Sequence, residues 1–134
     1  MNKIKKTYII DDDPIYIFGL KRIINQTDFC DSADVFNNGL EAITKIKELQ
    51  TENKPLPDLI LLDINMPIMD GWEFIEEFGK LDINKSTIIY IISSSIDPSD
   101  YERAMRINEV KSYIVKPIKP EDLGKIAVEF NQNM

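Results

Sequence analysis

The sequence predicts a doubly wound α/β fold, in which a five-stranded parallel sheet is covered by helices on both faces. Three observations support this prediction. Short apolar runs alternate five times with segments of helical periodicity. The runs are continuous, as is typical of parallel strands buried on both faces. Polar residues follow the carboxyl ends of several runs, where such folds bind ligands. Residues 1–134 are expected to form a single domain.

The first two β–α units begin with a clear strand and a weaker one. The clear strand is Tyr8–Ile10, and the weaker one is Ala33–Phe36. Asp13-Pro14 reads as an N-cap followed by proline at the first helical position, and Asn37–Gly39 leads into the second helix. The apolar residues expected on the inner faces of these two helices are Ile17, Leu20, Ile23 and Ile24, then Ala42, Ile43, Ile46 and Leu49.

The last three units follow a polar loop over residues 51–58. Leu59–Leu62 and Ile88–Ile92 are apolar runs, and Tyr113–Val115 is the fifth strand. The three helices that follow them are expected to begin at Gly71, at Asp97-Pro98 and at Lys119-Pro120. Their apolar positions are Phe74, Ile75 and Phe78, then Tyr101, Ala104 and Met105, and finally Leu123, Ile126, Ala127 and Phe130.

Composition excludes several classes of function. The formal net charge of −7 and the sequence pI of about 4.6 argue against direct binding of nucleic acid. The chain has no histidine, which excludes imidazole catalysis and histidine-ligated zinc. The single cysteine, Cys30, allows no internal disulfide and fits a reducing compartment. The apolar stretch near the N-terminus is too short to span a membrane. We therefore expect a cytoplasmic protein without membrane contact.

Acidic residues and hydroxyls gather at the ends of three expected strands. Asp11, Asp12 and Asp13 follow the first strand, Asp63 follows the third, and Ser93 follows the fourth. A carboxylate at the end of a buried strand is costly to desolvate unless something binds it. Carboxylate oxygens favour Mg²⁺, Mn²⁺ or Ca²⁺ over softer metals. The pattern predicts an acidic pocket suited to a divalent cation and a phosphoryl group.

Five motifs stand in order along nearly the whole chain. They are the acidic pair Asp11 and Asp12, the Asp63–Gly71 segment, the hydroxyl residue Ser93, the aromatic Tyr113, and Lys116 before Pro117. Together they resemble the receiver domain of two-component response regulators, in which the residue at the position of Asp63 is the phospho-acceptor. The resemblance implies a (βα)5 flavodoxin-like sandwich of three layers that stands alone, as in chemotaxis regulators.

The resemblance implies that Asp63 accepts a phosphoryl group in a reaction that requires Mg²⁺, with Mn²⁺ as a possible substitute. The metal would be bound by Asp12, by Asp63, by the backbone carbonyl of Asn65 and, through a water, by Asp11. Such a protein modifies itself, so it is not an enzyme acting on other substrates.

On the other side of the phosphoryl group, Lys116 would contribute a positive charge and Ser93 a hydrogen bond. Ser94 and Ser95 are alternatives to Ser93 for this hydroxyl. In the family, the bond draws the loop after the fourth strand inward, and the aromatic at the position of Tyr113 turns into the vacated space. The resemblance thus implies a phosphorylation-dependent switch.

The implied partners are proteins. A sensor histidine kinase or a histidine phosphotransfer protein would donate the phosphoryl group. An effector protein would bind the face formed by the fourth helix, the fifth strand and the fifth helix. The sequence departs from the family where Glu109-Val110 replaces the usual Gly-Ala before the fifth strand. We expect Asn108 to end the fourth helix there in the left-handed conformation.

Two alternative functions fit parts of the pattern. The first is a phosphatase resembling the haloacid dehalogenases, whose Asp-x-Asp motif could be Asp11-Asp12-Asp13. Ile15 stands where those enzymes usually carry threonine or valine, and the chain has no room for a substantial cap domain. The second is a pseudo-receiver that binds proteins without being phosphorylated. Asp13 and Asp70 are better interpreted as helix caps than as groups that take part in chemistry.

Overall fold

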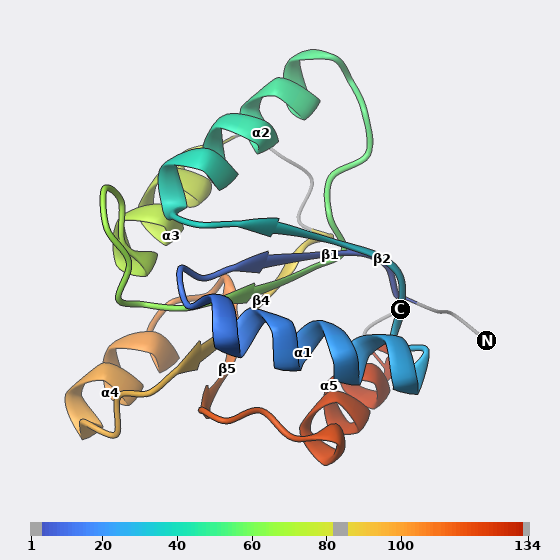
Figure 1. Cartoon of the computed structure of the whole chain (residues 1–134). Coiled ribbons are helices and arrows are strands. Elements are labelled where there is room, and N and C mark those ends of the chain that lie inside the picture. The colour runs from blue at the N-terminus through green and yellow to red at the C-terminus, as the bar shows by residue number, and fades with distance from the viewer. Residues whose placement is uncertain (1–3, 82–85, 133–134) are drawn as a thin grey trace.

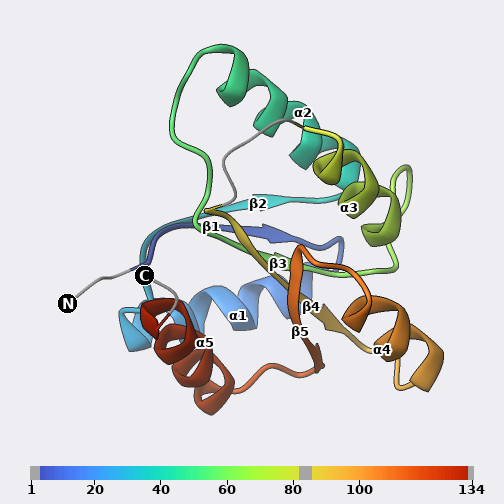
Figure 2. The same cartoon turned by 180° about the vertical axis from the view of Figure 1, so that it is seen from behind.

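A computed structural model of the chain shows one parallel sheet between two layers of helices (Figures 1 and 2). It describes residues 4–81 and 86–132. The strand order is β2-β1-β3-β4-β5, and every pairing is parallel. Helices α1 and α5 cover one face, whereas α2, α3 and α4 pack on the other. This confirms the doubly wound fold that the sequence predicts.

The strands and helices alternate without exception through the described residues. The elements are β1 Ile4–Ile10, α1 Pro14–Thr27, β2 Cys30–Phe36, α2 Gly39–Thr51, β3 Leu59–Leu62, α3 Gly71–Gly79, β4 Ile88–Ser93, α4 Pro98–Met105, β5 Val110–Val115 and α5 Pro120–Gln132. None of the helices formed by these residues combines the length and the apolar character that a bilayer crossing requires.

Three strands extend further toward their amino ends than the apolar runs predict. Strand β1 begins at Ile4, β2 at Cys30 and β5 at Val110. The added residues include lysines and an aspartate, yet they pair in register, as Lys6 does with Ser32. Strands β2 and β5 lie at the edges of the sheet and alternate in burial. At these positions backbone pairing, and not an apolar run, defines the strand.

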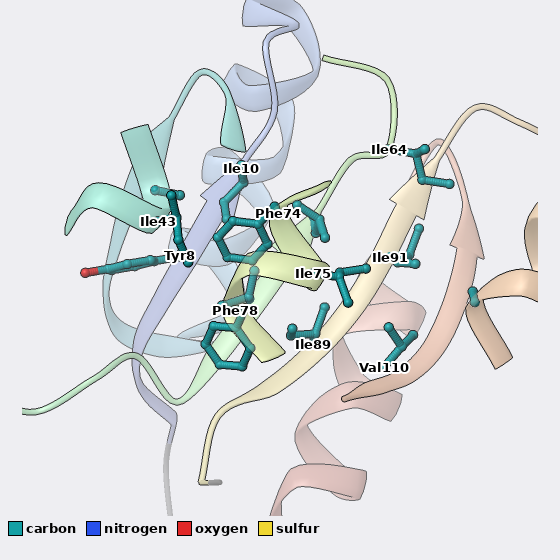
Figure 3. Packing of buried hydrophobic residues seen from close by; sticks show 14 of the residues in the cluster. Tyr8, Ile10, Ile43, Ile64, Phe74, Ile75, Phe78, Ile89, Ile91 and Val110 are labelled. Atoms are coloured by element: carbon teal, nitrogen blue, oxygen red, sulfur yellow. The ribbon is translucent and has the colours of Figure 1, made fainter. Parts of the chain in front are cut away.

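Each face of the sheet has its own apolar core. Figure 3 shows the cluster beneath α2 and α3, where Phe74 and Phe78 of α3 stack with ring centroids 6.0 Å apart. The second cluster lies between the sheet and helices α1 and α5, and includes Leu20 and Phe130. Strand β3 contributes to both clusters and all four of its residues are buried. Residues of the interior strand β3 therefore join the two cores through the sheet.

Helix α4 is the least buried helix and ends differently from the expectation. Ala104 is its one buried residue, while Tyr101 and Met105 are exposed. The helix is capped by Arg106 in a right-handed conformation, and the N–H of Ile107 donates to the carbonyl of Ala104. Asn108 does not adopt the left-handed conformation, so that prediction is wrong. A tightened last turn satisfies the helix end instead.

Candidate functional site

The acidic residues lie at the carboxyl ends of β1 and β3, where the strand order of the sheet changes direction. Strands β1 and β3 are neighbours, but β1 continues to β2 on one side and β3 to β4 on the other. Asp11 follows β1 and donates its backbone N–H to the carbonyl of Phe36, 2.9 Å away. The N–H of Asp63 donates to the carbonyl of Ile10, also at 2.9 Å. Backbone bonds to neighbouring strands therefore hold both carboxylates at the switch point of the fold.

Three carboxylates form a cluster that could hold a divalent cation. Asp11, Asp12 and Asp63 each offer an oxygen, and these oxygens lie within 4.8 Å of one another. Asp11 and Asp63 are buried, whereas Asp12 is exposed and leaves the cluster open to solvent. Hard oxygen ligands with an open side suit Mg²⁺, which retains several waters when bound to proteins. The donor set therefore fits the metal that the sequence predicts.

Lys116 approaches the same cluster from the end of β5. Its Nζ lies 2.9 Å from Asp11 Oδ2 and 3.6 Å from Asp63 Oδ2. The Lys116 side chain is only 14% exposed, so the ion pair between Lys116 and Asp11 is largely shielded from bulk water. The backbone N–H of Lys116 donates to the carbonyl of Ser93 at 2.8 Å, which fixes the end of β5 against the end of β4.

Burial and charge shift the pKa values of these groups. Burial, and then the charge of Asp11, raises the pKa of Asp63 from 3.8 to about 6, against the opposing effects of Lys116 and two backbone N–H groups. Burial also raises the pKa of Asp11. Burial alone would lower the pKa of Lys116, but its bond to Asp11 and the charge of Asp63 raise it on balance. At neutral pH, Asp63 is therefore mostly an ionised carboxylate beside an ammonium.

The loop after Asp63 bends back sharply to start α3. The N–H of Ile64 donates to Asp63 Oδ1 at 2.8 Å. Ile68 has a φ of 70°, which is unfavourable for a β-branched residue, and the N–H of Met69 donates to the carbonyl of Pro67 at 2.7 Å. Asp70 then caps α3 in a capping box with Glu73, as its interpretation as a cap predicts.

Gly71 is in tight contact with the backbone of the loop that carries Asp63. A Cβ atom on Gly71 would lie 2.4 Å from the carbonyl oxygen of Asp63 and 2.8 Å from Cα of Ile64. The N–H of Gly71 also donates to the carbonyl of Ile64 at 2.8 Å. The sequence marks Gly71 only as the start of a helix, but in the structure it sets how closely α3 approaches Asp63.

Ser93 and Tyr113 belong to a chain of hydrogen bonds beside the acidic cluster. Ser93 is fully buried, and its Oγ accepts the N–H of Ser95 at 3.1 Å. Ser95 Oγ donates to Asp100 Oδ2 at 2.6 Å, which makes Ser95 a link to α4. Tyr113 is 9% exposed and its hydroxyl donates to the carbonyl of Ser95 at 2.9 Å. Tyr113 thus already points inward.

The other predicted site residues lie around the cluster. Asn65 is exposed in the loop after β3, and its backbone N–H donates to the Asp63 carboxylate. Asp13 caps α1 by accepting the N–H groups of Ile15 and Tyr16, which confirms its interpretation as a cap.

Sequence reasoning missed Tyr16 itself, whose ring centroid lies 4.2 Å from Lys116 Nζ. Its place in the first turn after the acidic pair was the available signal.

Comparison with known proteins agrees with this geometry. The model of the response regulator receiver domain family matches residues 7–128. The chain therefore belongs to the response regulator receiver domains, a family of signalling proteins of two-component systems. It is 33% identical over 131 residues to the chemotaxis protein CheY of Thermotoga maritima, covering 92% of this chain and 98% of that one.

Solved structures give the same result. A two-component response regulator from Cytophaga hutchinsonii superposes with a TM-score of 0.88 at 33% identity, over 98% of this chain and 99% of that chain. The phosphorylated cyanobacterial phytochrome response regulator RcpA superposes with a TM-score of 0.76 at 25% identity, over 96% of this chain and 92% of that chain. The haloacid dehalogenase alternative is not favoured by these comparisons.

We predict that Gly71→Ala destabilises the protein because its Cβ has no room beside the Asp63 backbone. The free energy of unfolding should fall by about 1 to 3 kcal/mol in urea titrations, as for other overpacked sites. Gly124→Ala is the matched control, since a Cβ at Gly124 in α5 meets nothing within 4 Å. That change should raise stability by about 0.5 to 1 kcal/mol. Equal effects of the two substitutions would contradict the proposed contact.

We also predict that the stability gained by Asp63→Asn depends on pH. Folding raises the pKa of Asp63 from 3.8 to about 6. At a pH above both pKa values the ionised carboxylate therefore destabilises the folded state, and at a pH below both values this effect is absent. In EDTA at pH 8, Asp63→Asn should raise the free energy of unfolding by about 1 to 3 kcal/mol. Most of this gain should be absent at pH 4. Glu102→Gln, on the exposed surface of α4, is the control for a substitution of the same kind outside the cluster. A gain of the same size at both pH values would refute the prediction.

Proposed function

We propose that residues 1–134 act as a single phospho-accepting receiver, in which Mg²⁺-dependent transfer from a phosphohistidine to Asp63 changes a protein-binding surface. The observation that carries this proposal is the position of Asp63, which clusters with the carboxylates of Asp11 and Asp12 and lies 3.6 Å from the ammonium of Lys116. Membership of the receiver family supports it, as does the phosphorylated state of the similar RcpA structure. A cytoplasmic location is part of the same proposal.

The reaction transfers a phosphoryl group without a net redox change. A carboxylate oxygen of Asp63 attacks phosphorus in line, and a P–O bond forms as the P–N bond to the donor histidine breaks. The histidine nitrogen leaves with the electron pair, and Asp63 becomes an acyl phosphate. Such transfers depend mainly on positioning and on neutralising negative charge. The ammonium of Lys116, 3.6 Å from Asp63 Oδ2, is placed to do this for the phosphoryl oxygens.

The carboxylate cluster would hold the metal on the other side of the phosphoryl group. Asp12 and Asp63 would bind it directly, Asn65 through its backbone carbonyl, and Asp11 through a water. Mg²⁺, or Mn²⁺ in its place, would supply the positive charge that lets an anionic donor approach an anionic acceptor. Because Asp11 is already paired with Lys116 at 2.9 Å, an indirect contact suits it best.

Ser93 is the best placed of the three serines to bind the phosphoryl group. It is buried at the end of β4, whereas the hydroxyl of Ser95 is bonded to Asp100. The Ser93 hydroxyl accepts the N–H of Ser95 and retains its own proton for a phosphoryl oxygen. Tyr113 donates its hydroxyl to the Ser95 carbonyl, so its position would respond to the bond between Ser93 and the phosphoryl group. Tyr113 would therefore act as the switch residue. The effector would bind the face of α4, β5 and α5.

A phosphohistidine donor must reach Asp63 from the solvent side, and the segments that follow β1, β3 and β4 carry exposed apolar side chains. Ile15 is 83% exposed and Phe18 is 69% exposed on α1. Ile68 and Ile96, in the loops after β3 and β4, are 75% and 82% exposed. We propose that the sensor kinase or phosphotransfer protein packs on these residues. Exposed apolar groups around a functional site are typical of protein contacts.

Incubation with acetyl phosphate and Mg²⁺ tests the acceptor. The wild-type chain should gain one phosphoryl group, measured as intact mass, and lose it in hydroxylamine because the adduct is an acyl phosphate. EDTA should prevent the adduct, and Asp63→Asn should remove it. Asp13→Asn, which retains a capping side chain outside the cluster, is the control and should still be modified. An adduct on Asp63→Asn would overturn the assignment of Asp63.

Phe18→Ala separates donor binding from chemistry. With a phosphorylated histidine phosphotransfer protein that modifies the wild-type chain, Phe18→Ala should slow transfer by about tenfold, as for loss of an interface anchor. With acetyl phosphate the rate should be unchanged, because this donor needs no protein surface. Val128→Ala, at a residue 56% exposed on α5, should leave both rates unchanged. Equal transfer rates for Phe18→Ala and wild type with the protein donor would exclude Phe18 from the docking surface.

A further inference from the structure

Lys116 has a third neighbour that is not acidic. Its Nζ lies 4.2 Å from the centroid of the Tyr16 ring, in addition to its contacts with the carboxylates of Asp11 and Asp63. An ammonium at this distance over an aromatic face is attracted by the negative face of the ring. The contact is shielded from water, because the Lys116 side chain is only 14% exposed.

The hydroxyl of Tyr16 does not account for the position of the ring. It is buried and has no hydrogen-bond partner among the described residues. A buried hydroxyl without a partner is destabilising, so the position is not explained by the polar end of the side chain. The ring also packs against the apolar cluster beneath α1 and α5. What Tyr16 offers the site is therefore the face of its ring.

The backbone places this ring firmly. Tyr16 lies in the first turn of α1, and its N–H donates to Asp13 Oδ1 at 3.3 Å. The N–H of Asp13 in turn donates to Asp11 Oδ1 at 2.9 Å. The same short segment thus carries one carboxylate that pairs with Lys116 and the ring that lies against it. Movement of the Lys116 side chain is limited on the Asp11 side by a charge and on the Tyr16 side by the ring.

We propose that Tyr16 is a positioning residue for phosphoryl transfer, whose ring holds the ammonium of Lys116 at the carboxylates of Asp11 and Asp63. The inference rests on the proposed function, since it gives Lys116 its task. Loss of the ring should let Lys116 turn toward solvent or remain bound to Asp11 alone. The phosphoryl oxygens on Asp63 would then lose a fixed positive charge, whereas the carboxylate cluster on the metal side would be intact.

Two substitutions separate the ring from the hydroxyl. Tyr16→Phe keeps the aromatic face, and Tyr16→Leu keeps apolar bulk without it. With acetyl phosphate and Mg²⁺, Tyr16→Leu should form the adduct about five- to tenfold more slowly, and Tyr16→Phe within about twofold of wild type. Tyr16→Phe should also raise the urea midpoint, because it removes the buried hydroxyl. Mg²⁺ affinity measured by calorimetry should not fall in either variant, because the carboxylates of the cluster are intact.

A second measurement follows Lys116 directly and does not depend on phosphorylation. In NMR spectra of the unmodified protein, ring current should shift the ε-methylene protons of Lys116 upfield in the wild type and in Tyr16→Phe, but not in Tyr16→Leu. An unshifted signal in the wild type would overturn the proposal. So would equal rates for Tyr16→Leu and wild type, or Tyr16→Phe as slow as Tyr16→Leu. If the wild type forms no adduct while the ring-current shift is present, the proposed function fails and the contact stands.

Discussion

The ion pair between Lys116 and Asp11 is the interaction on which the site depends. Asp11 is 1% exposed, and a carboxylate so far from water would be strongly destabilising without a partner. Lys116 provides that partner from the end of β5, across the ends of β3 and β4. The pair therefore joins strands that are not neighbours. It also places a positive charge 3.6 Å from the Asp63 carboxylate.

This arrangement explains how the Asp63 carboxylate can be both buried and largely ionised. Burial, and then the charge of Asp11, favour the neutral form of Asp63 and raise its pKa to about 6. The ammonium of Lys116 and backbone N–H groups limit the rise. Asp63 therefore remains largely ionised at neutral pH. A bound cation would reduce the repulsion between the Asp63 and Asp11 carboxylates.

The sequence predicts the fold well because its strongest signals lie in the central strands. Strand β3 is buried throughout, and its bounds agree with the apolar run Leu59–Leu62. The edge strands β2 and β5 were predicted too short, since pairing extends them through polar residues. The end of α4 was assigned wrongly to Asn108, because a tightened turn satisfies the same carbonyls as a left-handed residue would. Local sequence cannot decide between those two endings.

The candidate site was predictable where the fold alone brings residues together. Asp11, Asp12 and Asp63 follow adjacent strands, so topology is enough to place them in one cluster. The contact between Tyr16 and Lys116 depends on how the first turn of α1 faces the end of β5. The pattern of apolar residues in the sequence does not predict that orientation.

The family resemblance implies an inward turn of Tyr113 only as a response to phosphorylation. Its inward position in this structure depends on the course of the loop after β4, which local sequence does not specify. The Ser93 hydroxyl accepts from Ser95 while Tyr113 donates to the Ser95 carbonyl. Ser93 can therefore donate its own proton to a phosphoryl oxygen without breaking either bond. The loop, the tyrosine and the acceptor pocket are already mutually compatible in this conformation. Phosphorylation of Asp63 would then stabilise an arrangement that the unmodified chain can adopt, which is how a population shift works.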